Sequence, residues 1–300
     1  MISTLITRLR QAAGLLMLSL NSVLHITPVL IIAVFKALLP VAAVRRTCDH
    51  ALMALAASWI DVNSWMMRTL TDTQLEVTGL PEPMPDGHCM IISNHQSWVD
   101  IPVLQALLNR RLPFMRFFLK SQLIWVPVLG LAWWAMDFPF MKRYSRAQIE
   151  RKPHLAGRDL AATRKACQKY RHLPVAIGNF VEGTRFRPDR HQAQASPFKH
   201  LLKPRAGGTA FVLNAMGDTL DTIVDVTIAY PDGPAELFDL FANRIQRVCV
   251  HLRILSLPAH LRDGDYENDA DYRAAFQAWI NQLWEDKDRL MESMLSAKPS

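Results

Sequence analysis

Cysteine is scarce in this sequence, and its distribution excludes two common kinds of structural site. The four cysteines lie 41, 78 and 82 residues apart, and none belongs to a Cys-x-x-Cys pair or to a cluster of histidine and cysteine. Structural zinc sites and disulfide frameworks need closely spaced or numerous cysteines, so neither is expected. Cys89 opens an apolar run and is expected to be a core thiol rather than a nucleophile. We therefore expect reduced cysteines, as in the cytosol, and neither a metal nor another cofactor.

Internal repeats, low-complexity segments and recognisable nucleic-acid-binding motifs are also missing from the 300 residues. The net charge is +7, but residues 142–205 hold sixteen lysines and arginines against four acidic residues. A basic segment of this kind indicates phosphate, an anionic membrane surface or nucleic acid as a partner, or simply a solvated basic face. Because no aromatic residues are interleaved with a binding motif, nucleic acid is not expected.

Charge is absent from a long stretch near the N-terminus. Ala12 to Phe35 comprises 24 uncharged, mostly apolar residues, whereas the apolar part of a secretory signal has only about 7–15. As a straight helix the stretch is about 36 Å long, enough for a hydrocarbon core of about 30 Å. Asn21, His25 and Pro28 interrupt it, so one tilted spanning helix and a re-entrant hairpin both remain open. Basic residues flank both ends and leave the orientation open as well.

Residues 1–70 are accordingly interpreted as a membrane anchor. Their second part, Ala51 to Leu70, mixes tryptophan and methionine with charged residues, as interfacial amphipathic helices do. An ordinary surface helix that packs on the core is the alternative for this part.

Strand-like and helix-like segments alternate over the rest of the chain, residues 71–300. The strand-like segments are 74–78, 89–93, 114–119, 138–141, 175–181, 224–230 and 248–255, and the helix-like segments are 100–108, 159–170 and 206–216. This alternation predicts an α/β domain with a mixed sheet flanked by helices. Residues 145–158 are a polar linker, and residues 271–295 carry apolar side chains at helical spacing, which predicts a long amphipathic helix.

Three pairs in the sequence share the spacing His-x4-Asp, which makes the spacing alone uninformative: His95–Asp100, His154–Asp159 and His260–Asp265. His95 follows an apolar strand and precedes a helix, a position at which α/β folds place ligands. If His95 lies in the turn before that helix, Asp100 can reach back to its ring, orient it and stabilise the imidazolium. The other two pairs lie in polar segments and are expected to be solvated. Ser93 or Asn94 is the expected cap of the helix.

A second polar group also follows a strand-like segment. Glu182-Gly183-Thr184-Arg185 comes directly after the apolar residues 174–181. Gly183 permits a tight turn, Arg185 can bind a phosphate with two hydrogen bonds, and Glu182 can accept one from a substrate or pair with an arginine. A base and an anion-binding turn together suggest a site that deprotonates a hydroxyl on an anionic substrate.

At these residues the chain resembles the lysophospholipid acyltransferase family, typified by 1-acylglycerol-3-phosphate acyltransferase. The family's first motif, Asn-His-x-Ser-x-x-Asp, is matched by 94–100, and its third, Phe-x-Glu-Gly-Thr-Arg, by 180–185. The second motif ends in Phe-x-x-Arg and maps to Phe140 and Arg143. Order and spacing agree from about residue 70 to 230, and a hydrophobic N-terminus is typical of the family.

Two positions depart from the family pattern. Asp137 stands where a glycine often opens the second motif, and the fourth motif reads Val224-Asp-Val-Thr-Ile-Ala-Tyr230, without a proline until Pro231. Both departures resemble the branch shared with eukaryotic endoplasmic-reticulum acyltransferases, whose acceptors vary.

The resemblance implies transfer of an acyl group from an acyl thioester, acyl-CoA or acyl carrier protein, to the hydroxyl of a lysophospholipid. His95 would be the general base, oriented by Asp100. The acceptor phosphate would be held by Arg143 and Arg185, with Glu182, Gly183 and Thr184 shaping the pocket and Lys120 as a weaker contact. Residues 123–134 would be core or the wall of an acyl-chain pocket.

A bacterial inner membrane, with the site facing the cytosol, is the location that the resemblance implies. Two alternatives stay open from the sequence. The acceptor could be another lysolipid, such as lysophosphatidylglycerol, or the protein could be a non-catalytic membrane protein that binds anionic lipids.

Overall fold

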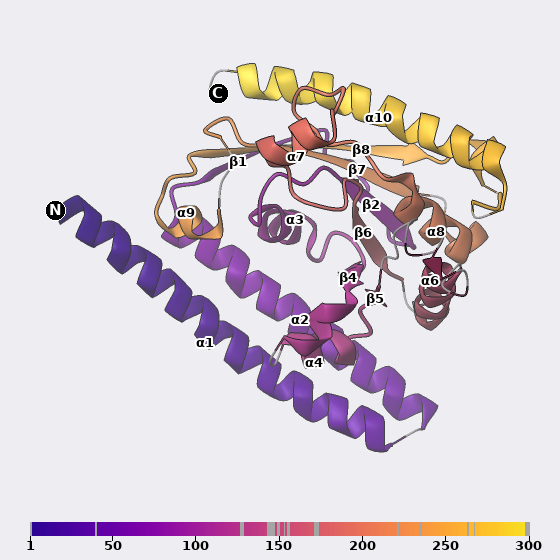
Figure 1. Ribbon diagram of the computed structural model, residues 1–300. Coiled ribbons are helices and arrows are strands. Elements are labelled where there is room, and N and C mark those ends of the chain that lie inside the picture. Colours follow the sequence, from indigo (N-terminus) through magenta and orange to yellow (C-terminus); the bar gives the residue numbers. More distant parts are fainter. Residues whose placement is uncertain are drawn as a thin grey trace.

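A helical hairpin and an α/β domain make up the computed structural model (Figure 1). It describes residues 2–39, 41–126, 129–142, 148, 151–152, 154, 157–170, 174–220, 222–233, 236–262, 264–266 and 268–297. The hairpin lies on one side of the domain, and the C-terminal helix lies on the opposite side. This arrangement is the predicted fold class, a mixed sheet flanked by helices with a long apolar helix at the N-terminus.

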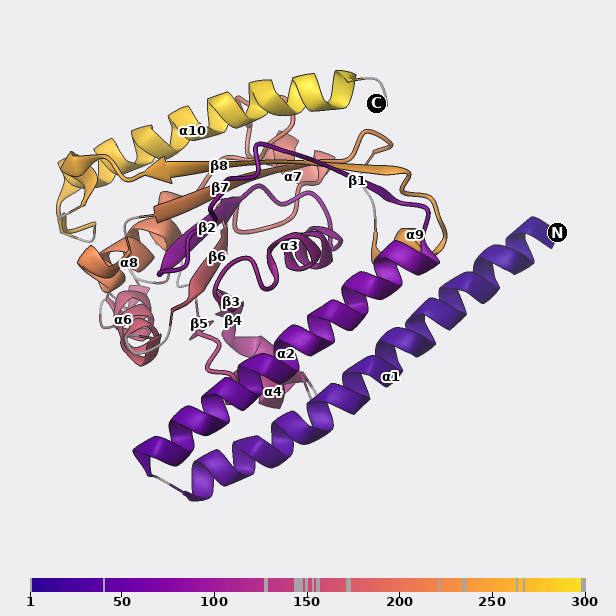
Figure 2. The same cartoon turned by 180° about the vertical axis from the view of Figure 1, so that it is seen from behind.

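The hairpin consists of α1 (Ile2–Leu38) and α2 (Ala42–Leu70), which run side by side in both views (Figures 1 and 2). The apolar stretch of the sequence forms a single helix that continues through Pro28 and does not fold back on itself. The chain returns through the next helix, α2. The polar residues of α1 face α2: Asn21 Nδ2 donates to Asn63 Oδ1 over 2.7 Å, and His25 Nε2 lies 3.1 Å from Ser58 Oγ. Their hydrogen bonds fix the pairing of the two helices.

The opposite surface of α1 remains apolar and exposed. Exposed side chains include Leu9, Leu20, Leu24 and Phe35, and the helix Thr4–Leu38 is long and apolar enough to cross a membrane. Only 11% of its most apolar window is buried inside the protein, which separates it from the core helix of a soluble protein. This surface indicates association with a membrane.

A cluster of charged residues joins the hairpin to the domain. Lys36 Nζ lies 2.7 Å from Asp49 Oδ1 on α2 and 2.7 Å from Asp137 Oδ2, just after α4 (Leu129–Ala135). All three side chains are partly buried, so the contacts are less screened than those of surface ion pairs. Asp137, one of the two departures from the family pattern, therefore has a structural partner on the anchor.

A six-stranded sheet forms the centre of the domain, in the order β1-β8-β7-β2-β6-β3. Its strands are β1 (Gln74–Thr78), β2 (Cys89–Ser93), β3 (Met115–Phe117), β6 (Ala176–Phe180), β7 (Thr222–Ala229) and β8 (Arg247–Ser256). Only β7 and β8 pair antiparallel; the other neighbours are parallel. The sheet is mixed, as predicted.

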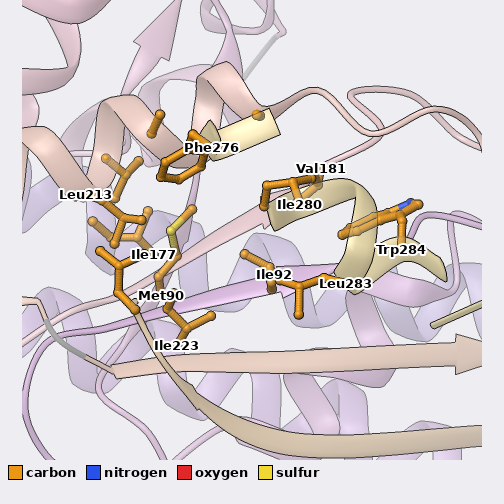
Figure 3. Close-up of a cluster of buried hydrophobic side chains, with 14 of the residues drawn as sticks. Met90, Ile92, Ile177, Val181, Leu213, Ile223, Phe276, Ile280, Leu283 and Trp284 are labelled. Carbon is orange, nitrogen blue, oxygen red and sulfur yellow. The ribbon is translucent and has the colours of Figure 1, made fainter. Parts of the chain in front are cut away.

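Alternate residues of the central strand β2 enter two separate cores. Met90 and Ile92 pack with α10 (Ala270–Ser296), α8 (Ala206–Met216) and α6 (Arg158–Tyr170), as seen in Figure 3 for α10 and α8. Cys89 and Ile91 pack on the other face, against α3 (Asp100–Leu108). Cys89 is completely buried, and burial raises the pKa of its thiol to about 12, as befits a core residue rather than a nucleophile.

Smaller elements close one edge of the domain. The segment expected as one strand over 114–119 is divided: β3 joins the main sheet, whereas β4 (Leu119–Lys120) pairs with β5 (Phe140–Met141) in a second sheet. A 3₁₀ helix, η1 (Ser121–Trp125), and α4 follow, and short helices α7 (Pro188–Ala193) and α9 (Leu237–Phe241) lie in later loops. Arg143 and most of the expected linker 145–158 lie outside the described residues.

Candidate active site

The two polar motifs meet at one edge of the sheet because β2 and β6 are parallel neighbours. Ser93, the last residue of β2, is in register with Phe180, the last residue of β6. Beyond the strands, the backbone N–H of Phe186 donates to the carbonyl of His95 over 2.7 Å. The rings of His95 and Phe180 stack with their centroids 4.0 Å apart. The sequence therefore brings both motifs to one place, at the carboxyl end of parallel strands.

His95 lies in the turn before α3, and Asp100 is the first residue of that helix. His95 Nδ1 is 2.8 Å from Asp100 Oδ2, which is the geometry that the sequence predicts. Asp100 is completely buried, whereas 13% of the His95 side chain is exposed. When Nδ1 carries the proton that bonds to Asp100, Nε2 is free to accept a proton from a substrate.

Asp100 accepts more hydrogen bonds than the one from His95. The backbone N–H groups of Gln96 and Ser97 donate to Oδ2 over 2.7 and 2.9 Å. The hydroxyl of Tyr230 donates to Oδ1 over 2.7 Å. Four donors thus surround a fully buried carboxylate, which fixes its orientation.

The expectation that Ser93 or Asn94 caps α3 is wrong. The N-cap residue is Val99, and no side chain caps the helix. Asn94 instead bonds to the backbone of β7, accepting from Ile228 N over 2.9 Å and donating to Ile228 O over 2.8 Å. These bonds satisfy the end of a buried strand, where an unpaired peptide group would be costly. Asn94 thereby fixes the position of the end of β7, which carries Tyr230.

Glu182 does not face the substrate side of its turn. Its side chain is completely buried, and neither carboxylate oxygen accepts a hydrogen bond of ordinary geometry from any residue that the structure describes. The nearby indole of Trp284 and the backbone amides of His95 and Leu202 act to lower the pKa of Glu182. Burial nevertheless raises the pKa of Glu182 well above its usual range. Glu182 was expected at the acceptor pocket, but it is not among the residues that line the cavity beside this turn.

The rest of the turn presents cations to one side. Gly183 adopts φ +71°, a left-handed conformation that favours glycine. The guanidinium of Arg185 lies 4.4 Å from the centroid of the Trp98 ring, and its NH1 is 3.4 Å from both carboxylate oxygens of Glu236. Arg190 on α7 donates to the hydroxyl of Thr184 and to the carbonyl of Arg185. Two guanidinium groups are therefore held together by the turn.

A cavity of about 500 Å³ opens beside these residues. Its polar lining includes His95, Lys120, Arg185 and Arg190, with Gly183 and Thr184 beside them. The larger part of the wall is apolar and comes from α2, α3, β3, η1 and α4. His95 and three cationic side chains thus share a cavity with mostly apolar walls, which suits a lipid that carries phosphate.

Most residues proposed from the sequence meet at this cavity. The cavity is lined by His95, Lys120, Gly183, Thr184 and Arg185. Asp100 does not line it but is hydrogen-bonded to His95, which does. Leu123 and Trp133 also line it, while the neighbouring Trp125 is 84% exposed, so the apolar segment 123–134 serves as cavity wall and as surface.

The two other His-x4-Asp pairs do not resemble this site. His260 is exposed, and the carboxylate of Asp265 bonds to Asn268 instead. His154 is exposed as well. At the strand end, by contrast, Asp100 is completely buried and receives hydrogen bonds besides that of His95.

Sequence reasoning missed Trp98, Arg190, Tyr230 and Glu236. Trp98 lies within the first motif, and Arg190 belongs to the basic segment, so both had a weak signal. Tyr230 and Glu236 contact the site from the loop after β7, which no local pattern reveals.

Comparison with known proteins identifies the family. The family model described as acyltransferase matches residues 74–230, more than half of the sequence. The chain belongs to the acyltransferase family. This range contains the two motifs, the cavity cations and Tyr230.

Individual acyltransferases share about a quarter of their aligned residues with this chain. Lysocardiolipin acyltransferase 1 of Danio rerio is 25% identical over 264 residues, which cover 82% of this chain and 62% of that protein. The 1-acyl-sn-glycerol-3-phosphate acyltransferase epsilon of Mus musculus is 23% identical over 282 residues, covering 86% and 70%. The chain spans about three fifths of the length of the former relative.

The fold has a counterpart among solved structures. The 1-acyl-sn-glycerophosphate acyltransferase PlsC of Thermotoga maritima superposes with a TM-score of 0.58 at 12% identity, covering 98% of this chain and 100% of that one. The hairpin therefore belongs to the shared fold as well as the α/β domain.

Proposed function

We propose that the protein is an O-acyltransferase that moves a fatty acyl group from an acyl thioester to the free hydroxyl of a lysophospholipid, such as 1-acyl-sn-glycerol-3-phosphate. The observation that carries this proposal is the His95–Asp100 pair in a largely apolar cavity that Arg185 and Arg190 also line. Family membership and the acceptors named in the relatives support it.

In the proposed reaction, His95 Nε2 takes the proton of the acceptor hydroxyl while the oxygen attacks the thioester carbonyl carbon. Asp100 stabilises the imidazolium that forms, and its hydrogen bond keeps Nε2 directed at the cavity. The carbon–sulfur bond then breaks, and the imidazolium returns its proton to the leaving thiolate. The products are an ester and a free thiol. A general base of this kind accelerates a reaction by about 10²–10⁴-fold.

The acceptor phosphate is assigned to the cations beside the base. Arg190 on α7 donates to the carbonyl of Arg185, and Arg185 reaches the cavity beside the Trp98 ring. A planar guanidinium suits two parallel hydrogen bonds to phosphate oxygens. Lys120, exposed at the end of β4, supplies a third positive charge. Arg143 stays a proposed phosphate ligand on the second motif alone.

The proposed location is a bacterial inner membrane with the cavity on the cytosolic side. The exposed apolar surface of α1 supports membrane attachment. The basic residues around the cavity favour an anionic lipid surface, and acyl-CoA or acyl carrier protein would supply the acyl group from the cytosol. No further cofactor is needed for the proposed reaction.

The experiment that tests this function is acyl transfer by the purified full-length protein in mixed micelles. Labelled acyl-CoA, and separately acyl carrier protein, is incubated with lysophosphatidic acid, lysophosphatidylglycerol and a lysocardiolipin. Label that moves from the thioester into one lysolipid supports the reaction and identifies the acceptor and donor together. Lipid binding without transfer to any acceptor would favour the non-catalytic alternative and contradict the proposal.

A further inference from the structure

The hydroxyl of Tyr230 contacts Asp100, the residue that orients His95 in the proposed mechanism. Tyr230 directly follows β7 and is 6% exposed. Its hydroxyl donates to Asp100 Oδ1 over 2.7 Å, on the carboxylate oxygen opposite the one that faces His95. Tyr230 does not line the cavity, so it reaches the chemistry only through Asp100.

The other donors to Asp100 cannot replace this contact. Gln96 N, Ser97 N and His95 Nδ1 all approach Oδ2, whereas the Tyr230 hydroxyl donates to Oδ1. Without that hydroxyl, Oδ1 would be a fully buried carboxylate oxygen that has lost a donor. Such a group is expensive to bury, and it loses the bond that stops the carboxylate from rotating.

Several contacts hold Tyr230 in the position that this bond needs. Asn94 joins the end of β2 to Ile228 through two hydrogen bonds, two residues before Tyr230. The carbonyl of Tyr230 accepts from Gly233 N over 3.0 Å in the turn that follows. Burial raises the pKa of the Tyr230 phenol well above its usual range, so the hydroxyl keeps its proton and remains a donor at neutral pH.

We propose that Tyr230 is a positioning residue of the acyltransferase site: its hydroxyl fixes Asp100, and through Asp100 it fixes the tautomer and orientation of His95. The catalytic relay is thus Tyr230–Asp100–His95. This inference rests on the proposed function. It also gives a role to the end of the fourth motif, where the chain carries tyrosine and then proline.

Replacing Tyr230 by phenylalanine tests the role, because only the hydroxyl is lost. Hydrogen bonds to charged groups are strong enough that kcat should fall by about tenfold to hundredfold. The acceptor and donor KM should stay within about twofold of wild type, since Tyr230 does not line the cavity. Tyr170→Phe is the matched control: its hydroxyl is also buried and donates over 2.6 Å, but to the carbonyl of Asp137.

A double-mutant cycle separates positioning from a general effect on packing. In Asp100→Asn, whose slow residual turnover is followed with labelled acyl-CoA, adding Tyr230→Phe should change kcat by less than about twofold, because the relay is already broken. A loss that multiplies with that of Asp100→Asn would overturn the relay.

The circular dichroism spectrum and the thermal midpoint of Tyr230→Phe are compared with those of Tyr170→Phe. A loss of kcat that Tyr170→Phe matches at equal thermal midpoint would also overturn the role. If the wild type is active and Tyr230→Phe keeps the same kcat, only the role of Tyr230 is contradicted. An inactive wild type contradicts the proposed function itself.

Discussion

Two fully buried carboxylates lie in the two halves of the candidate site, and their surroundings differ. Asp100, in the His95 half, receives four hydrogen bonds. Glu182, in the Arg185 half, receives none of ordinary geometry from the described residues. Both are completely buried, so the two carboxyl groups differ in their hydrogen-bond donors and not in their depth.

The difference suggests separate tasks for the two halves. Asp100, immobilised by its donors, can stabilise charge that develops on His95 during the reaction. Glu182, whose raised pKa favours the neutral acid, suits a turn that must present positive charge without a competing anion. We therefore expect damage to the first half to lower kcat, and damage to the second half to weaken binding of the acceptor.

The largest effect is expected for His95→Ala. Without the base, kcat should fall by about 10²–10⁴-fold, while the thermal midpoint and membrane association remain close to wild type. His260→Ala is the control, because His260 has the same spacing to an aspartate but is exposed and away from the cavity. Near-normal acyl transfer by His95→Ala would refute the mechanism.

Arg185→Ala should act on the other half. Loss of the guanidinium should raise the acceptor KM by about tenfold to hundredfold, with a smaller change in kcat. Arg187→Ala provides the comparison, since Arg187 is two residues away, exposed, paired with Asp189 and absent from the cavity wall. If the acceptor KM of Arg185→Ala equals that of Arg187→Ala, Arg185 does not bind the acceptor.

Glu236→Gln should have a smaller effect of opposite sign. Glu236 is 64% exposed and pairs with Arg185 over 3.4 Å, so it competes with a phosphate for the same guanidinium. Removing its charge should lower the acceptor KM by about twofold to fivefold, as expected for an exposed ion pair. Glutamine still accepts the backbone hydrogen bond that caps α9. An acceptor KM that rises would show that Glu236 assists binding instead.

Glu182→Gln is expected to affect stability, with its sign set by pH. Folding raises the pKa of Glu182. The contribution of its neutral carboxyl group to the free energy of unfolding is therefore complete below the pKa of a glutamate in the unfolded chain, about 4.3, and is lost as pH rises through the pKa of Glu182 in the folded protein. Glutamine cannot ionise, so the Glu182→Gln variant does not lose this stability as pH rises. The thermal midpoint of Glu182→Gln should therefore exceed that of wild type by a few degrees at pH 8, and less at pH 5.

Glu292→Gln is the control for this prediction. Lys199 and His200 lower the pKa of the exposed Glu292, so its neutralisation should bring no gain at pH 8. A Glu182→Gln variant less stable than wild type at pH 8 would mean that the ionised carboxylate is stabilised in the fold.

Much of the fold follows from local patterns. The bounds expected for β1, β2, α3 and α8 agree with the structure, because local sequence patterns, such as the apolar run of β2, mark each segment. The strand expected over 114–119 was divided, because the choice between the two sheets depends on pairing partners far away in the sequence. Periodicity carries no information on such partners.

The candidate site could be predicted in the same uneven way. The His95–Asp100 contact spans five residues, so helix geometry was enough to predict it. Tyr230 is 130 residues away from Asp100, and its contact depends on the neighbouring places of β2 and β7 in the sheet. Asn94 shows the converse: its residue type favours a helix cap, but the unpaired end of β7 was the stronger partner.

The α2 helix has a consequence for handling the enzyme. Ala56, Trp59 and Ile60 of α2 form part of the cavity wall, and α2 is paired with the exposed apolar helix α1 through partly buried polar contacts. Deleting the first 70 residues to obtain a water-soluble catalyst would therefore open the substrate cavity on one side. A cut between residues 70 and 71 therefore cannot separate the proposed membrane attachment from the proposed catalysis, because α2 belongs to the helical hairpin and also to the cavity wall.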